Sequence, residues 1–112
     1  MGFRAPVEEI GFTMRHIAGL DALLAAGGFD DLSADTVTAI LVEAGRFTEE
    51  ELDPINQAGD RVGCHLDNGK VTTAPGWKDA YQRWAEAGWN GVSAPVEWGG
   101  QNLPVMVHAA LN

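Results

Sequence analysis

Residues 33–63, SADTVTAILVEAGRFTEEELDPINQAGDRVG, are the stretch on which the predicted fold depends. Apolar residues recur in it every three or four positions, and most positions between them are polar or acidic. The stripe consists of Val37, Ile40, Leu41, Ala44, Phe47, Ile55 and Val62. This spacing matches the period of an amphipathic α-helix, about 3.6 residues, with one buried side. We therefore expect a long central helix against which the rest of the 112-residue chain packs.

Both ends of this helix carry the usual end signals. Ser33 is a good N-cap, and Asp35 adds negative charge where the helix dipole favours it. Gly63 ends the helix, with Arg61 in the last turn. Pro54 lies inside the stretch, so the helix is expected either to kink there or to divide into two.

The segments on either side are shorter. Residues 1–32 are expected to hold a helix from Pro6 through Ile17 and a second one from Ala22 to Ala26 that Asp21 caps. Residues 64–74 contain Asn-Gly between two short β-compatible runs, which is a strong hairpin signal. These runs are too short for an independent sheet, so we expect an ordered protruding loop.

The C-terminal third combines helices with an irregular loop. Residues 75–88 predict a helix whose apolar face, expected in the core, consists of Trp77, Ala80, Tyr81, Trp84 and Ala85. Residues 89–103 are rich in Gly, Pro and Trp, and we expect this loop to pack against something. Residues 104–112 begin a helix that is apolar nearly all round, as if cut short of its partners. The fold class is therefore all-α: a small bundle-like helical domain with one long kinked helix and a hairpin-like loop.

Composition excludes several functions. The net charge of −9 disfavours nucleic acid and anionic membranes as partners, because both would repel the chain. No apolar run approaches the roughly 20 residues of a membrane span, and the N-terminus lacks the features of a signal peptide. The single cysteine, Cys64, cannot form an internal disulfide and suits a reducing compartment. We expect a cytoplasmic protein.

Residues with chemical potential are present but do not form a recognisable site. His16, His65 and His108 are too scattered along the sequence to predict a metal centre. The acidic run at 49–51 is better explained as a solvated helix face than as paired catalytic carboxylates. Ser93 has no identifiable base partner, so it is not supported as a nucleophile. We expect no catalytic residue and no metal ligand in this chain.

The order of three motifs is nevertheless specific. Residues 5–20 read APVEEIGFTMRHIAGL, residues 39–89 run from AILVEAGRF to WAEAGW, and residues 91–104 read GVSAPVEWGGQNLP. In this order they closely resemble the N-terminal region of acyl-CoA dehydrogenases, in a bacterial subgroup with an extra N-terminal segment. The resemblance covers essentially the whole chain. The family usually has Tyr or Phe at the position of Trp98 and Gly at that of Asn102, so Asn102 should stiffen the turn.

The resemblance implies an FAD-dependent oxidoreductase of fatty acid metabolism that converts an acyl-CoA thioester to the trans-2-enoyl-CoA and passes electrons to electron-transfer flavoprotein. It implies an N-terminal helical domain beside a middle β-domain and a C-terminal helical domain, in a homotetramer or homodimer. The family's catalytic glutamate and FAD-binding segments lie in the later domains. We therefore expect this chain alone to bind no FAD and to contribute scaffold and pocket wall.

The family loop motif corresponds here to Ser93, Pro95, Glu97, Gly99, Gly100 and Leu103. The helix that follows this loop in the family continues along the acyl-chain pocket. This makes Met106, Val107 and Ala110 candidates for the pocket wall, with ordinary interdomain core as the alternative. Two other functions stay open for the whole chain. One is a stand-alone, non-enzymatic interaction module that docks through an exposed apolar C-terminal surface. The other is a helical domain that binds a small apolar ligand.

Overall fold

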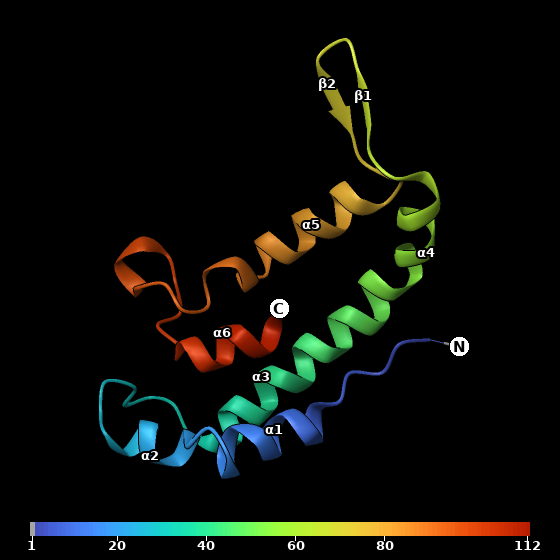
Figure 1. The fold of residues 1–112 in the computed structure, drawn as a ribbon. Helices are drawn as coiled ribbons and strands as arrows, with labels where there is room; N and C mark the ends of the chain where they lie inside the picture. The colour runs from blue at the N-terminus through green and yellow to red at the C-terminus, as the bar shows by residue number, and fades with distance from the viewer. Residues whose placement is uncertain (1) are drawn as a thin grey trace.

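The computed structural model describes residues 2–112. Figure 1 shows the order of elements: α1 (Val7–His16), α2 (Leu20–Ala25), α3 (Ala34–Phe47), η1 (Thr48–Leu52), α4 (Asp53–Val62), β1 (His65–Asp67), β2 (Lys70–Thr72), α5 (Trp77–Glu86), η2 (Trp89–Gly91), η3 (Val96–Trp98) and α6 (Val105–Leu111). Helix accounts for 61 % of the chain and strand for 5 %, which agrees with the expected all-α class.

The long helix runs without a break through α3, η1 and α4. The Ser33 hydroxyl accepts a hydrogen bond from the backbone N–H of Thr36, which confirms the expected N-cap. The segment η1 is a π-helical turn, in which the N–H of Asp53 donates to the carbonyl of Thr48. Pro54 follows this turn and has no N–H to donate. The irregularity therefore falls just before the proline, and the helix is not divided there.

The two N-terminal helices differ in detail from those expected. Helix α1 ends at His16, so that Ile17, expected as its last residue, lies just beyond it and is exposed. Helix α2 begins at Leu20, directly after Gly19 in the left-handed conformation (φ 78°), so that Asp21 is not its cap. Glycine adopts this conformation without steric penalty, and the resulting turn directs Leu20 into the core.

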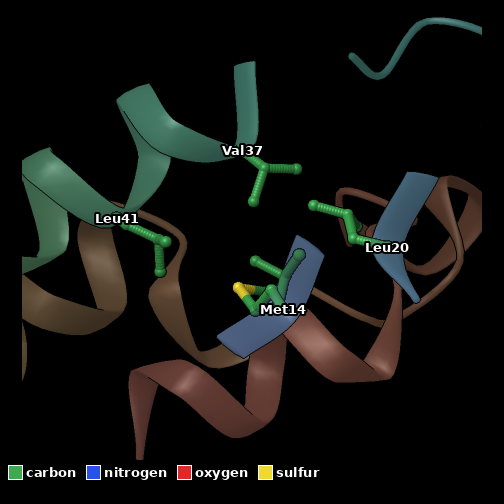
Figure 2. Packing of buried hydrophobic residues seen from close by; sticks show 5 residues of the cluster. Met14, Leu20, Val37 and Leu41 are labelled. Atoms are coloured by element: carbon green, nitrogen blue, oxygen red, sulfur yellow. The ribbon is translucent and has the colours of Figure 1, made fainter. Parts of the chain in front are cut away.

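The core lies where α1, α2, α3 and α6 meet. Its buried side chains point toward one another in Figure 2, which labels Met14, Leu20, Val37 and Leu41; Val107 of α6 completes the cluster. Removing these side chains from water stabilises the fold by roughly 25 cal/mol per Å² of apolar surface. The first half of the predicted stripe is thus confirmed as a buried face, whereas Val62 at its far end is exposed.

The hairpin is formed as expected. Strands β1 and β2 pair antiparallel, with Leu66 opposite Val71, and the turn residues Asn68 and Gly69 both have positive φ. Every residue of the two strands is exposed, and the hairpin stands away from the helices in Figure 1. Its pairing satisfies backbone groups but adds no apolar burial.

The helices form an open, flat layer rather than a compact bundle. The molecule measures 52 × 37 × 18 Å, and its radius of gyration is 16.6 Å, against about 13 Å for a compact domain of similar length. In Figure 1, the long helix extends beyond the core to the hairpin, and α5 returns from the base of the hairpin toward the core. Because the layer is open, some side chains that sequence periodicity assigned to the interior are accessible to solvent.

Candidate functional site

The Gly- and Pro-rich loop between α5 and α6 is ordered and folds back on itself. Four backbone N–H groups of its second half donate to carbonyl oxygens of its first half at 2.8–3.1 Å: Gly100 to Pro95, Gln101 to Gly91, Asn102 to Ala94 and Leu103 to Val92. These bonds satisfy the backbone without regular structure. The loop is therefore a defined part of the fold.

Two positions of the loop require special backbone geometry. A side chain at Gly100 would collide with the backbone carbonyl of Ala94, so only glycine fits there. Asn102 has φ 52°, in the left-handed region that Asn tolerates better than most residues. The turn therefore has a left-handed backbone conformation at this position, which glycine would also adopt.

The loop is attached to α6 by a side-chain pair. The Ser93 hydroxyl oxygen lies 2.8 Å from Nδ1 of His108, and both residues are half-buried. The expectation that Ser93 has no base partner is therefore wrong. The two residues are 15 positions apart, and they meet because the loop folds back on itself. Among the hydrogen bonds of the described residues the imidazole has no carboxylate partner, and its contact with Ser93 joins the loop to α6.

The other residues of the loop motif have different surroundings. Pro95, Glu97 and Gly99 are exposed, whereas Leu103 packs against the core. Trp98 is 81 % exposed, so the expectation that this loop packs against something fails at Trp98.

The three predicted pocket-wall residues lie on α6. Val107 is fully buried in the core, while Met106 and Ala110 are half-buried and pack against it. Ala110 also lines a small hollow of about 170 Å³ between the N-terminal segment, α3 and the end of α6. Val107 and Met106 therefore act as core within this chain, and of the three Ala110 faces a hollow.

A larger hollow of about 470 Å³ lies between α5 and the junction of η1 with α4. Its lining comes from three parts of the chain: Phe3; Thr48, Leu52, Asp53, Ile55 and Asn56; Trp77, Ala80, Tyr81 and Trp84. Sequence analysis missed this site because it assigned the α5 stripe to the core. Within that stripe Ala80 is buried and Trp84 is half-buried, but Trp77 is 45 % and Tyr81 65 % exposed and Ala85 is exposed, so that assignment is wrong for these three residues. Periodicity identifies a shared face, but it does not reveal what covers that face.

The aromatic walls of this hollow are held in place. The indole N–H of Trp77 donates to the carbonyl of Ile55 at 3.3 Å. A Cβ added at Gly59 would lie 2.5 Å from the Trp77 ring, so α4 needs glycine for the indole to lie against it. At the other end, Trp84 packs between Phe47 and Trp89, with ring centroids 5.3 and 5.4 Å away.

The N-terminal segment is fastened to the long helix beside this hollow. The backbone N–H of Phe3 donates to Asp53 Oδ2 at 3.0 Å, and that of Ala5 donates to Glu49 Oε1 at 2.9 Å. The guanidinium of Arg4 contacts Glu49 Oε2 at 2.7 Å. The hydrogen bond from Ala5, followed by that from Arg4, lowers the pKa of the Glu49 carboxyl below its ordinary value. Phe3 is thereby positioned as one side of the hollow.

Other site types were considered for residues 2–112. No three His, Cys, Asp or Glu side chains in this range lie close enough together to hold a metal ion. No helix in the same range has the length and apolar character needed to cross a membrane.

Comparison with known proteins gives the context of this geometry. No protein-family model matches the chain. The chain is 36 % identical over 110 residues to 3-methylmercaptopropionyl-CoA dehydrogenase of Ruegeria pomeroyi, an alignment that covers 98 % of this chain and 19 % of that protein. It is 29 % identical over 112 residues to the broad-specificity linear acyl-CoA dehydrogenase FadE5 of Mycobacterium tuberculosis, and this alignment covers 98 % of this chain and 18 % of that protein.

The chain is similar to part of an acyl-CoA dehydrogenase. It spans about a fifth of the length of the curated relatives it matches. The similarity extends over nearly all of this chain, which agrees with the resemblance seen in the three motifs and is consistent with a fragment of such an enzyme. The assignment to a bacterial subgroup stays a prediction.

Proposed function

We propose that this chain is the N-terminal helical part of an FAD-dependent acyl-CoA dehydrogenase. The observation that carries the proposal is the end-to-end similarity to two proteins named as acyl-CoA dehydrogenases, each about five times longer. In this proposal the complete enzyme introduces a double bond between the α and β carbons of an acyl-CoA thioester. Bound FAD would accept the hydride, and electron-transfer flavoprotein would take up the electrons.

The residues of this chain act as scaffold in the proposal. Arg4 and Arg83 are paired with Glu49 and Glu51, so their charges are already compensated and do not favour binding of the pyrophosphate of FAD. We therefore assign the FAD contacts and the catalytic base to the remainder of a longer protein. Ala110 and the small hollow beside it are the part of this chain proposed to face the acyl chain.

A chimera tests the proposal. The segment of the Ruegeria pomeroyi dehydrogenase that aligns with this chain is replaced by residues 1–112, and the purified product is examined for the visible absorbance of flavin and for acyl-CoA oxidation with an artificial electron acceptor. We expect a flavin-loaded, active chimera. The same chimera with Gly100→Val should lose activity, because the loop cannot close around a side chain at that position.

The isolated chain gives the complementary result. We expect residues 1–112 alone to purify without flavin and to show no turnover. A flavin-loaded preparation of the isolated chain would contradict the assignment of FAD contacts to other segments. An inactive, flavin-free chimera that is well folded by circular dichroism would instead favour the stand-alone interaction module.

A further inference from the structure

The larger hollow has the features of a small-molecule site that the proposed function does not use. We propose that it binds a small amphiphilic organic cation, with its apolar body against Trp77 and Tyr81 and its positive head at the carboxylate of Asp53. The inference rests on the size and lining of the hollow, on the contacts that hold its aromatic walls and on its charge.

Size and lining fit a ligand of this kind. The hollow encloses about 470 Å³, and known small-molecule pockets span roughly 300–1,000 Å³. Apolar and aromatic side chains form most of its lining, and a few polar groups could orient a ligand: the side chains of Thr48, Asp53 and Asn56. The Thr48 hydroxyl already donates to the carbonyl of Ala44, which leaves Asp53 and Asn56 as the principal polar contacts.

The aromatic walls are arranged before any ligand arrives. Trp77 is held by its hydrogen bond to the Ile55 carbonyl and by Gly59, and Trp84 is held by the rings on either side of it. The Tyr81 hydroxyl accepts a hydrogen bond from the Asn90 side chain at 3.2 Å. A site whose side chains are already fixed loses less conformational entropy when it binds a ligand.

Charge decides which amphiphile is favoured. Asp53 is the one charged residue in the described lining of the hollow. Within residues 2–112 its carboxylate accepts a hydrogen bond from the Phe3 N–H and forms no ion pair. Arg4 and Arg83 are outside the lining and pair with Glu49 at 2.7 Å and Glu51 at 2.6 Å.

The net charge of the whole chain also favours a cationic ligand. Its net charge is −9, which repels anions such as fatty acids. Aromatic faces, in contrast, attract ammonium groups through cation–π interaction. An organic cation is therefore preferred to a neutral or anionic amphiphile of the same length.

Three probes with an eight-carbon chain and different head groups separate the contributions of charge and of apolar contact. Octyltrimethylammonium, octanol and octanoate are titrated into the 112-residue chain below their micellar concentrations, and binding is followed by calorimetry and by tryptophan fluorescence. We expect octyltrimethylammonium to bind about tenfold more tightly than octanol, and octanoate to bind most weakly. Equal affinities, tighter binding of octanoate, or no binding of any probe would overturn the proposal.

Paired variants locate the site. Asp53→Asn keeps an oxygen that can accept from the Phe3 N–H but removes the charge, and it should reduce the preference for octyltrimethylammonium over octanol. Asp79→Asn makes the same charge change on an exposed residue of α5 outside the lining, and it should preserve the preference. An equal loss in both variants would show a general charge effect and overturn the assignment to Asp53.

Two further variants test the aromatic wall. Tyr81→Ser should weaken the binding of all three probes. Trp98→Ser, which removes an exposed ring outside the lining, should leave the three affinities unchanged. An N-terminally acetylated chain is measured alongside, because the α-amino group precedes Gly2 in the sequence and carries its own positive charge. The preference for the cation should persist after acetylation. Its disappearance would overturn the proposed role of Asp53.

Discussion

The hydroxyl oxygen of Ser93 lies 2.8 Å from Nδ1 of His108, and this contact attaches the loop between α5 and α6 to α6 itself. In the same region the N–H of Leu103 donates to the carbonyl of Val92 at 2.8 Å, and Val92 is fully buried. The loop and α6 thus form one unit, and α6 in turn places Val107 in the core.

Ser93→Ala should lower the free energy of unfolding by about 1 kcal/mol, because it removes a hydrogen bond and leaves a half-buried imidazole nitrogen without a protein partner. Urea denaturation provides the measurement. In a double-mutant cycle with His108→Ala, the combined loss should be smaller than the sum of the two single losses. Strictly additive losses would show that the two side chains do not interact in solution.

Val107→Ala should lower the free energy of unfolding by roughly 2 kcal/mol, since it removes buried apolar groups and leaves a cavity beside Met14 and Leu41. Val105→Ala is the matched control on the same helix. Val105 is 75 % exposed, and its replacement should change stability by less than about 0.5 kcal/mol. Equal effects of the two substitutions would mean that α6 does not dock as described.

Gly100→Ala should destabilise the chain by about 1–3 kcal/mol, because the added Cβ would collide with the carbonyl of Ala94 and force the loop to move. Gly11→Ala is the control. Gly11 lies within α1 and a Cβ there would meet nothing within 4 Å, so alanine should raise stability by about 0.5–1 kcal/mol through its helix propensity. Thermal unfolding of both variants should therefore shift in opposite directions.

The stability contributed by the contacts between the N-terminal segment and Glu49 should depend on pH. The pKa of Glu49 is lowered in the folded state by the bonds from Ala5 and Arg4, so its stabilising contribution is present above the ordinary value of 4.5 and is lost as the pH falls through the folded pKa. The stability difference between the natural chain and Glu49→Gln should therefore be largest near neutral pH and should shrink in acid.

Denaturant titrations at a series of pH values measure this difference. Glu97→Gln serves as the control, because Glu97 is exposed and forms no ion pair within residues 2–112. Its stability difference from the natural chain should vary less with pH. A difference for Glu49→Gln that stayed constant down to about pH 3 would contradict the described contacts.

Local sequence patterns were sufficient for the elements whose signals lie within a few residues of one another. The N-cap at Ser33, the end of the long helix at Gly63 and the hairpin turn at Asn68 all depend on short-range backbone chemistry, and all three are present. The similarity to acyl-CoA dehydrogenases likewise depended on the linear order of motifs.

Features that depend on distant segments needed the tertiary structure. Ser93 meets His108 because the loop doubles back, and the larger hollow exists because Phe3, Asp53 and Trp77 are brought together from segments far apart in the sequence. The stripe on α5 is apolar at helical spacing whether or not another element covers it, so its exposure could not be predicted from periodicity. Amphipathic patterning specifies which side chains share a face, whereas the packing of whole elements determines which faces are buried.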